Sequence, residues 1–309
     1  MKRPDPELGD REVRGGTRRQ FLQSAAAGLL ASTGVPKVAE AFDFEAFFQK
    51  HFRQMSDEEL DATLERLARK YSRQYGVDVE LDATGPIDGV VYGYGLDISR
   101  CIGCRRCVYA CVEENNQSRD PEIHWIRVLE FEREALIRGI NLEDGDPYYD
   151  REQAPAPDKV YLPIACQHCE ESPCTDVCPT GATWREPDGI VVIDYDWCIG
   201  CRYCMASCPY GARHFNWTEP HIPKDELNAD MHVIGNRPRT RGVVEKCTFC
   251  IQRVRDGRYP ACLEACPVGA RKFGNLLDPN SEIRQVMKEK RTFVLKAELN
   301  TKPKFFYFF

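Results

Sequence analysis

The sequence predicts an α+β fold with a helical segment at its N-terminal end. Apolar residues recur at three- and four-residue steps between residues 44 and 76, which is the period of an amphipathic helix. Further along, short runs rich in β-branched and aromatic residues predict strands. These runs alternate with sixteen cysteines, all of which lie between Cys101 and Cys266. With 309 residues, 42% of them hydrophobic, the chain can bury one large core or two small ones.

Residues 1–41 have the pattern of an export signal. Arg18 and Arg19 precede a run of small and apolar residues, and Ala39-x-Ala41 offers the small side chains that a signal peptidase accepts. The pattern predicts twin-arginine export, the route for proteins already folded around a cofactor, and hence a location on the periplasmic side of the cytoplasmic membrane. An ordinary apolar helix is the alternative. The run is shorter than the ~20 residues that span a bilayer, so we expect no direct membrane span and any attachment through a partner.

Residues 42–93 contain no cysteine and form the predicted N-terminal helical segment. Two apolar runs at helical spacing follow each other there: Phe44, Phe47, Phe48 and Phe52, then Leu60, Leu64, Leu67 and Tyr71. Ser56-x-x-Glu59 is a capping box, which predicts the start of the second helix. We expect the segment to pack on the core, with packing on a partner as the alternative.

The cysteine-bearing core is predicted over residues 94–275, followed by a tail at 276–309 that packs on the core or on a partner. Its strand-like runs are "HWIRVLEFE" (124–132), "KVYLPIAC" (159–166) and "ATWREPDGIVVID" (182–194), the last with Pro187-Asp188-Gly189 as a hairpin turn. Two polar, proline-bearing segments, 133–158 and 217–242, are predicted to be inserted loops. Within the second, the basic patch "RPRTR" (237–241) is expected to be solvated, with docking as a weaker alternative.

The cysteines fall into four groups of four, with none left over. They are Cys101, Cys104, Cys107 and Cys111; Cys166, Cys169, Cys174 and Cys178; Cys198, Cys201, Cys204 and Cys208; and Cys247, Cys250, Cys262 and Cys266. The chain also repeats "CPTGA" (178–182) as "CPYGA" (208–212) and "CPVGA" (266–270), and "CIGCRRC" (101–107) as "CIGCRYC" (198–204). Such self-similarity indicates one supersecondary unit that is used several times.

The spacing of the third group indicates the chemistry. Cys198-x2-Cys201-x2-Cys204-x3-Cys208-Pro matches the bacterial iron–sulfur run, in which three thiolates bind one cubane and the fourth binds another. A glycine inside the loop lets the backbone approach the cluster. Zinc is the main competitor for C-x2-C pairs, but zinc sites do not explain the third and fourth cysteines. Disulfides compete less well, because C-x2-C loops make poor structural crosslinks.

Other functions find no support in the sequence. The net charge of −6 is mild, which argues against nucleic-acid binding. The chain has no P-loop, no G-x-G-x-x-G after a strand and no nucleophile elbow, so we expect no catalytic residue of its own. His168 lies between Cys166 and Cys169. Hydrogen bonding or packing is a better role for it than ligation, because cysteines already supply every ligand.

With these groups in view, the chain resembles the four-cluster iron–sulfur subunits of the dimethyl sulfoxide reductase type, the relatives of the iron–sulfur component of polysulfide reductase and of formate dehydrogenase beta. The resemblance covers residues 94–309 and is carried by "CQHCEESPC", "CPYGARHFNW" and "EKCTFCIQR". The tail "FGNLLDPNSEI" is most similar to the exported branch found beside NrfD-like membrane subunits, including hydrogenase-2-type and sulfite-reduction-associated chains.

The resemblance implies two ferredoxin-like (βαββαβ) units related by a pseudo-two-fold axis, each with two [4Fe–4S] clusters and crosswise ligation. It implies Cys101, Cys104, Cys107 and Cys266 for cluster 1; Cys247, Cys250, Cys262 and Cys111 for cluster 2; Cys166, Cys169, Cys174 and Cys208 for cluster 3; and Cys198, Cys201, Cys204 and Cys178 for cluster 4. Some relatives lack a third-group ligand and hold a [3Fe–4S] centre. Since Cys201 is present here, we expect four [4Fe–4S] clusters.

By the same resemblance, the chain is a non-catalytic electron-transfer subunit of a respiratory complex. One end would face a catalytic subunit, which is a molybdopterin enzyme, a nickel–iron hydrogenase or a multihaem cytochrome c. The other end would face an NrfD-like membrane subunit that exchanges electrons with quinone. A free periplasmic polyferredoxin is the alternative, although segments 42–93 and 133–158 add surface without clusters. A zinc- or disulfide-stabilised structural protein is the third possibility.

Overall fold

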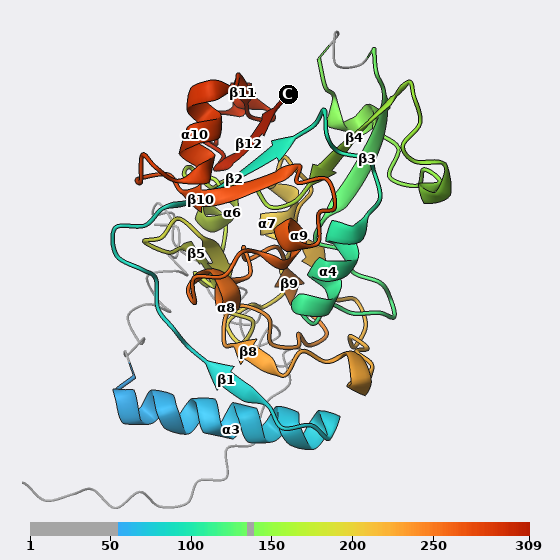
Figure 1. Ribbon diagram of the computed structural model, residues 1–309. Helices are drawn as coiled ribbons and strands as arrows, with labels where there is room; N and C mark the ends of the chain where they lie inside the picture. The colour runs from blue at the N-terminus through green and yellow to red at the C-terminus, as the bar shows by residue number, and fades with distance from the viewer. Residues whose placement is uncertain (1–54, 135–138) are drawn as a thin grey trace, which may run out of the picture. The chain divides into compact units, whose positions relative to one another are not determined.

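The largest sheet joins distant parts of the chain. In the computed structural model, which describes residues 55–134 and 139–309, this sheet has the strand order β10-β2-β12-β11. Its strands are β2 (Tyr92–Asp97), β10 (Arg271–Asn275), β11 (Thr292–Phe293) and β12 (Phe305–Phe308). Strand β10 runs antiparallel to β2, whereas β12 runs parallel to β2 (Figure 1). The C-terminal tail therefore supplies an inner strand of the core sheet, beside the strand that leads into the first cysteine group.

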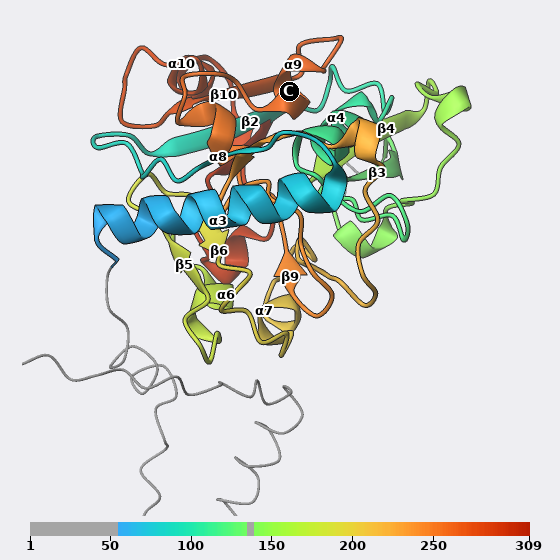
Figure 2. The same cartoon turned by 90° about the horizontal axis from the view of Figure 1, so that it is seen from below.

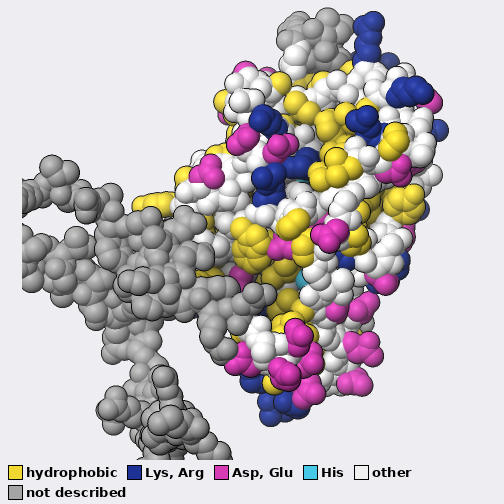
Figure 3. Space-filling model, turned by 90° about the vertical axis from the view of Figure 1, so that its left-hand side faces the viewer, with side chains coloured by type: hydrophobic (Ala, Val, Ile, Leu, Met, Phe, Trp, Pro, Cys, Tyr) yellow, Lys and Arg dark blue, Asp and Glu magenta, His cyan; other side chains and the backbone are white. Residues whose placement is uncertain are grey.

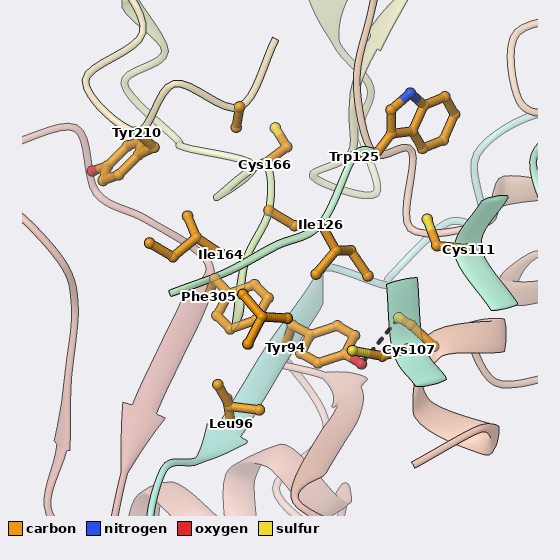
Figure 4. Packing of buried hydrophobic residues seen from close by; sticks show 14 of the residues in the cluster. Tyr94, Leu96, Cys107, Cys111, Trp125, Ile126, Ile164, Cys166, Tyr210 and Phe305 are labelled. Atoms are coloured by element: carbon orange, nitrogen blue, oxygen red, sulfur yellow. Dashed lines mark hydrogen bonds between the residues drawn. The ribbon is translucent and has the colours of Figure 1, made fainter. Parts of the chain in front are cut away.

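Aromatic packing holds this sheet to the cysteine loops. All six residues of β2 are buried, and the Tyr94 ring stacks on Phe305 of β12 with centroids 4.7 Å apart. Figure 4 shows both rings in one packed cluster with Cys107 and Cys166. Cys107 and Cys166 are thus part of the hydrophobic core.

The three predicted strand runs are confirmed, and with one further pair they form two-stranded antiparallel ladders. The ladders are β3 (Arg127–Glu132) with β4 (Lys159–Ile164), β5 (Thr183–Arg185) with β6 (Val191–Ile193), and β7 (His214–Phe215) with β9 (Val244–Glu245). The β5–β6 hairpin turns at Gly189, whose φ of 82° is readily adopted only by glycine. Each ladder lies next to a cysteine group along the sequence and positions the loop that carries it.

Short helices follow the cysteine loops. The α-helices are α4 (Arg106–Glu114), α6 (Pro173–Asp176), α7 (Tyr203–Ala206), α8 (Ile251–Val254), α9 (Ala261–Glu264) and α10 (Glu282–Glu289), and the 3-10 turns are η1 (Leu142–Asp144), η2 (Arg151–Gln153), η3 (Lys224–Glu226) and η4 (Ala297–Leu299). α4 packs on α9, and α6 packs on α7. Because α4 carries Cys107 and α9 carries Cys262, the first contact joins the first and fourth cysteine groups. The second contact joins the second and third groups through Cys174 and Cys204.

The capping box at Ser56 is confirmed. Helix α3 (Asp57–Tyr75) begins there, because the Ser56 hydroxyl accepts from the Glu59 N–H while the Glu59 carboxylate accepts from the Ser56 N–H. The predicted export signal, residues 1–41, and the first apolar run, residues 44–52, lie outside the described residues.

Helix α3 builds a small hydrophobic core with part of the second insertion. Leu67, Tyr71 and Tyr75 pack with Ile222 and Met231. Strand β1 (Glu80–Asp82) pairs in parallel with β8 (Asp230–His232) beside them. Figures 1 and 2 show α3 lying along one face, next to β1. The segment 217–242 thus contains strand β8, whose partner strand lies far away in the sequence.

The basic patch "RPRTR" is not solvated as expected, because Arg237 and Arg239 are only 3% and 4% exposed. Arg239 pairs with Glu245 at 2.9 Å, and both side chains are almost fully buried. Arg237 pairs with Asp196 at 3.0 Å. Arg239 also donates to the Asn115 carbonyl at 2.6 Å. Opposite charges and carbonyl oxygens within the fold draw these guanidinium groups inward, since a buried charge needs such partners.

The first insertion, 133–158, reaches back to the first cysteine loop. The Tyr149 hydroxyl donates to the Gly103 carbonyl, and the Arg105 guanidinium donates to the Pro147 carbonyl at 2.7 Å. Arg105 also lies over the Tyr149 ring, 4.3 Å from its centroid. The insertion thus braces the loop that carries the first three cysteines.

Across residues 55–134 and 139–309, no helix has the length and apolar character that crossing a membrane requires. The face shown in Figure 3 mixes basic, acidic and hydrophobic side chains, with acidic ones most numerous toward its lower part.

Candidate metal centres

All sixteen cysteines belong to the described residues, and none of them forms a disulfide. Eight are buried and eight are half-buried, so none projects into solvent. The cysteines gather instead into four quartets, which we call sulfur sets 1 to 4.

Sulfur set 1 consists of Cys101, Cys104, Cys107 and Cys266. They line one hollow between the first cysteine loop and the start of β10. Burial raises the pKa of the Cys101 thiol to about 12, and the nearby charges of Cys107 and Cys266 add to the rise. The backbone at Gly103 has a φ of 68°, and a Cβ there would lie 2.5 Å from the Tyr161 ring. Glycine is therefore required at this position, because a larger residue would clash with Tyr161.

Sulfur set 2 consists of Cys247, Cys250, Cys262 and Cys111. Burial raises the pKa of Cys111 well above its ordinary value, and the charges of the other three raise it further. The Gln117 side-chain amide donates to the Cys111 sulfur at 3.2 Å. The Asn115 amide reaches the sulfurs of both Cys111 and Cys250, at 3.6 and 3.5 Å. Helix α4 thus supplies one sulfur, and Asn115 and Gln117 just after it supply two donors, beside a loop more than a hundred residues away in the sequence.

Sulfur set 3 consists of Cys166, Cys169, Cys174 and Cys208. Burial raises the pKa of Cys169 to about 12, with further raising by the charges of the other three cysteines. The Arg213 guanidinium donates to the Cys174 sulfur at 2.9 Å and to the Thr183 hydroxyl at 3.0 Å.

Sulfur set 4 consists of Cys198, Cys201, Cys204 and Cys178. They line a second hollow. The Val244 N–H donates to the Cys198 sulfur at 3.5 Å. Gly200 has a φ of 71°, and a Cβ there would lie 2.2 Å from the Gly242 carbonyl oxygen, so this position also requires glycine. The loops of sets 1 and 4 are therefore built alike, as their repeated sequence predicts.

The sets follow one another in a row. Cys107 of set 1 lies close enough to Cys262 of set 2 for their charges to interact. Cys247 of set 2 and Cys166 of set 3 interact in the same way, and so do Cys174 of set 3 and Cys204 of set 4. These electrostatic interactions link the sets in the order 1, 2, 3, 4.

The donor chemistry of the two hollows fits iron–sulfur clusters. Among the described residues that line them, there is no carboxylate, and each hollow includes two arginines: Arg105 and Arg271 in the first, Arg202 and Arg213 in the second. Thiolates alone are the ligands that iron–sulfur clusters use, and N–H groups aimed at sulfur tune them. Burial raises the pKa of four thiols in these hollows, those of Cys101, Cys107, Cys198 and Cys204. Bound metal would favour the deprotonation of these thiols, so cluster assembly would release protons. Within 55–134 and 139–309, no three metal-binding side chains converge on a single ion.

His168 has a packing and hydrogen-bonding role, as expected. Its side chain is fully buried, and its ring lies 3.7 Å from that of Phe249, centroid to centroid. Its Nδ1 accepts from the Val191 N–H at 3.0 Å. Burial, with help from Lys246, lowers the pKa of His168 well below its ordinary value, so the ring is neutral.

Sequence reasoning missed three buried cations beside the sulfurs: Arg271, Lys246 and Arg213. They are 4%, 1% and 4% exposed. A signal was present for two of them, because Arg213 and Arg271 each follow a C-P-x-G-A repeat directly. Lys246 had no such signal, since a lysine is usually a surface residue.

Comparisons with known proteins agree with this geometry. Two family models, both described as a 4Fe–4S dicluster domain, match residues 100–182 and residues 157–241 with 232–276. A protein of Halobacterium salinarum, assigned as an iron–sulfur subunit of a dimethyl sulfoxide reductase, is 44% identical over 220 residues, 70% of this chain and 78% of that protein.

Two further relatives carry a quinone in their names. The iron–sulfur subunit 1 of an Hdr-like menaquinol oxidoreductase from Archaeoglobus fulgidus is 39% identical over 243 residues, 70% of this chain and 82% of that one. The iron–sulfur cluster-binding subunit of a menaquinone reductase from Nitratidesulfovibrio vulgaris is 38% identical over 247 residues, 71% of this chain and 88% of that one.

The segments matched by the family models contain all sixteen cysteines and therefore all four sulfur sets. The relatives are iron–sulfur subunits of oxidoreductases and resemble this chain over most of their length. The chain therefore belongs to the family of 4Fe–4S dicluster proteins that act as electron-transfer subunits of respiratory oxidoreductase complexes.

Proposed function

We propose that each sulfur set ligates one [4Fe–4S] cluster and that electrons pass singly along the four clusters in the order 1, 2, 3, 4. This proposal rests on the electrostatic interactions between cysteines of neighbouring sets. They join Cys107 with Cys262, Cys247 with Cys166, and Cys174 with Cys204. When bound, the clusters supply the one-electron chemistry. The chain supplies spacing, burial and hydrogen bonds to sulfur.

The exposure of the cysteines supports a relay with two ends. In sets 1 and 4, three of the four cysteines are half-buried. In sets 2 and 3, three of the four are buried. Electrons would therefore enter and leave at sets 1 and 4, while the middle pair stays shielded from water.

The proposed architecture is two ferredoxin-like dicluster units related by a pseudo-two-fold axis. α4 and α9 join sets 1 and 2, and α6 and α7 join sets 3 and 4. The two CIGC loops repeat the same backbone, because Gly103 and Gly200 have φ of 68° and 71° and Arg105 and Arg202 have φ of 56° and 65°. Shared local geometry of this kind supports two copies of one unit.

The proposed setting is a complex on the periplasmic side of the cytoplasmic membrane, reached by twin-arginine export. One end of the relay serves a catalytic subunit, which is a molybdopterin enzyme, a nickel–iron hydrogenase or a multihaem cytochrome c, and the other serves an NrfD-like, quinone-reactive membrane subunit. The quinones in the names of two relatives support the second partner. The arginine pair at Arg18 and Arg19 supports the route. The chain performs no catalysis itself.

Affinity purification of the tagged full-length chain from native membranes, under anaerobic conditions, tests this setting. We expect it to co-purify with one integral membrane subunit and one catalytic subunit, and its clusters to become reduced when a quinol is added. A brown monomer in the soluble periplasmic fraction, unreactive toward quinol in membranes, would favour the free polyferredoxin instead.

A further inference from the structure

The buried cation Lys246 lies where the two halves of the relay meet. It directly follows β9 and directly precedes Cys247, and its side chain is 1% exposed. Its ammonium group donates to the Val191 carbonyl of β6 and to the Cys247 carbonyl, the latter at 2.7 Å. Two strands and a cysteine loop thus fix the position of one positive charge.

The negative groups acting on this ammonium are cysteine sulfurs. Burial lowers the pKa of Lys246 and the charge of Arg213 lowers it further, while the charges of Cys166, Cys247 and Cys174 raise it. Cys247 belongs to set 2, and Cys166 and Cys174 belong to set 3. The hydrogen bonds place the ammonium group between the same two loops, because Val191, whose carbonyl accepts from Lys246, donates its N–H to His168 between Cys166 and Cys169. The charge of Lys246 therefore lies between the cysteine loops of two different sets.

Arg213 and Arg271 interact in the same manner with the other two pairs of consecutive sets. The Arg213 guanidinium donates to Cys174 of set 3 and lies close to Cys204 of set 4. Arg271 acts on Cys107 of set 1 and Cys262 of set 2. Each pair of consecutive sets thus has one buried cation between its members. Arg213 and Arg271 lie inside the two halves, and Lys246 lies between them.

We infer that Lys246 is a positioning residue that holds up the reduction potentials of clusters 2 and 3 together, so that electron transfer between the two halves is not impeded. The inference rests on the proposed ligand sets. Reduction adds one negative charge to a cluster, and a fixed cation in a low-dielectric interior stabilises that added charge. Because Lys246 acts on sulfurs of both middle sets, its charge favours the reduced form of both clusters.

A purely structural role is the competing explanation, since the ammonium ties β6 to the cysteine loop by hydrogen bonds. Lys246→Gln separates the two roles, because glutamine keeps a donor for the carbonyls and removes the charge. Lys246→Arg keeps the charge. Lys290→Gln, at an exposed lysine, is the matched control for loss of one charge.

The test is an EPR-monitored redox titration of each anaerobically purified full-length variant, with iron analysis. We expect Lys246→Gln to keep its iron and to lower two of the four midpoint potentials, while Lys246→Arg and Lys290→Gln match the unmodified protein. The two shifted signals should be those that disappear in Cys250→Ala and in Cys169→Ala.

Unchanged potentials in an iron-replete Lys246→Gln protein would overturn the inference, and so would an equal shift in Lys246→Arg. Failure of Lys246→Gln to hold the middle clusters, under conditions in which Lys246→Arg holds them, would also overturn it, because the charge would then serve assembly. None of these results touches the proposed function. That fails separately if the unmodified protein does not show four clusters.

Discussion

Gly200 illustrates how single residues shape the cluster loops. Its backbone is left-handed, and the space where a Cβ would lie is occupied by the Gly242 carbonyl oxygen at 2.2 Å. That neighbour is a backbone atom and cannot rotate away. Gly103 has the same conformation, but the atoms it would meet belong to the Tyr161 side chain. The loop of set 4 therefore tolerates an added side chain at its glycine less well than the loop of set 1.

We expect Gly200→Ala to lose cluster 4 selectively. The substitution adds a clash with backbone to the strain of a left-handed alanine, which alone costs about 1–2 kcal/mol. Iron analysis and EPR of the purified protein should show about a quarter of the iron missing and one signal absent.

Gly257→Ala is the matched control for this change. Gly257 has a φ of 74°, but nothing lies within 4 Å of the added Cβ. This variant should therefore keep all its iron. If both variants kept all four clusters, the tight fit at Gly200 would have no bearing on cluster binding.

The helices α4 and α9 bring together cysteines from groups that are distant in the sequence. α4 carries Cys107, which belongs to set 1, and Cys111, which belongs to set 2. α9 carries Cys262 of set 2, and Cys266 of set 1 follows it closely. The packing of α4 on α9 therefore builds two sets at once. A cysteine substitution in one loop should therefore alter the cluster whose other ligands come from a different loop.

Cys266→Ala tests this exchange. The EPR spectrum of the reduced Cys266→Ala protein should match that of Cys104→Ala, because both lose a ligand of cluster 1. It should differ from the spectrum of Cys250→Ala, which loses a ligand of cluster 2. A spectrum equal to that of Cys250→Ala would show that Cys266 serves the cluster of its own loop.

The helix α3 and strand β8 form a unit of their own within the fold. Met231 is fully buried among the apolar residues contributed by both. We expect Met231→Ala to destabilise this small core by about 2–5 kcal/mol. Hydrogen exchange should then accelerate over residues 57–82 and 222–233, while the cluster signals stay unchanged because no sulfur set belongs to this core.

Met55→Ala serves as the control for that experiment. Met55 is 54% exposed and lies just before α3. It should leave the exchange of both segments as it is. Loss of clusters in Met231→Ala would instead show that α3 and β8 support the relay directly.

At the scale of the whole molecule, three buried cations interact with consecutive sulfur sets: Arg271 with sets 1 and 2, Lys246 with sets 2 and 3, and Arg213 with sets 3 and 4. The outer sets contain more of the half-buried cysteines, and the inner sets contain more of the buried ones. Such an arrangement gives two ends where partners can exchange electrons and a shielded middle that conducts between them. In the proposed relay, the fold therefore holds the clusters at fixed positions in the order 1, 2, 3, 4.

Local patterns predicted much of this molecule correctly. The capping box at Ser56, the hairpin at Gly189 and the four cysteine groups each depend on residues that are close in the sequence. The inner position of β12 and the parallel pairing of β1 with β8 depend on partners far along the chain, which no periodicity reveals.

Burial of charge was the other feature that the sequence did not reveal. Arg239 and Lys246 look like surface residues, yet Arg239 pairs with Glu245 and Lys246 donates to the Val191 and Cys247 carbonyls. Those partners become visible only when the strands and loops are assembled. Prediction from sequence thus succeeded for local structure and failed for the charges around the cysteines.

The most direct test of this account is a spin-quantified EPR redox titration of the full-length protein, purified anaerobically, together with iron and zinc analysis. The account predicts about sixteen iron atoms per molecule, four in each of four clusters. It also predicts four one-electron signals that broaden as neighbouring clusters become reduced together. A protein that holds zinc in place of iron, or that shows four magnetically isolated clusters, would contradict it.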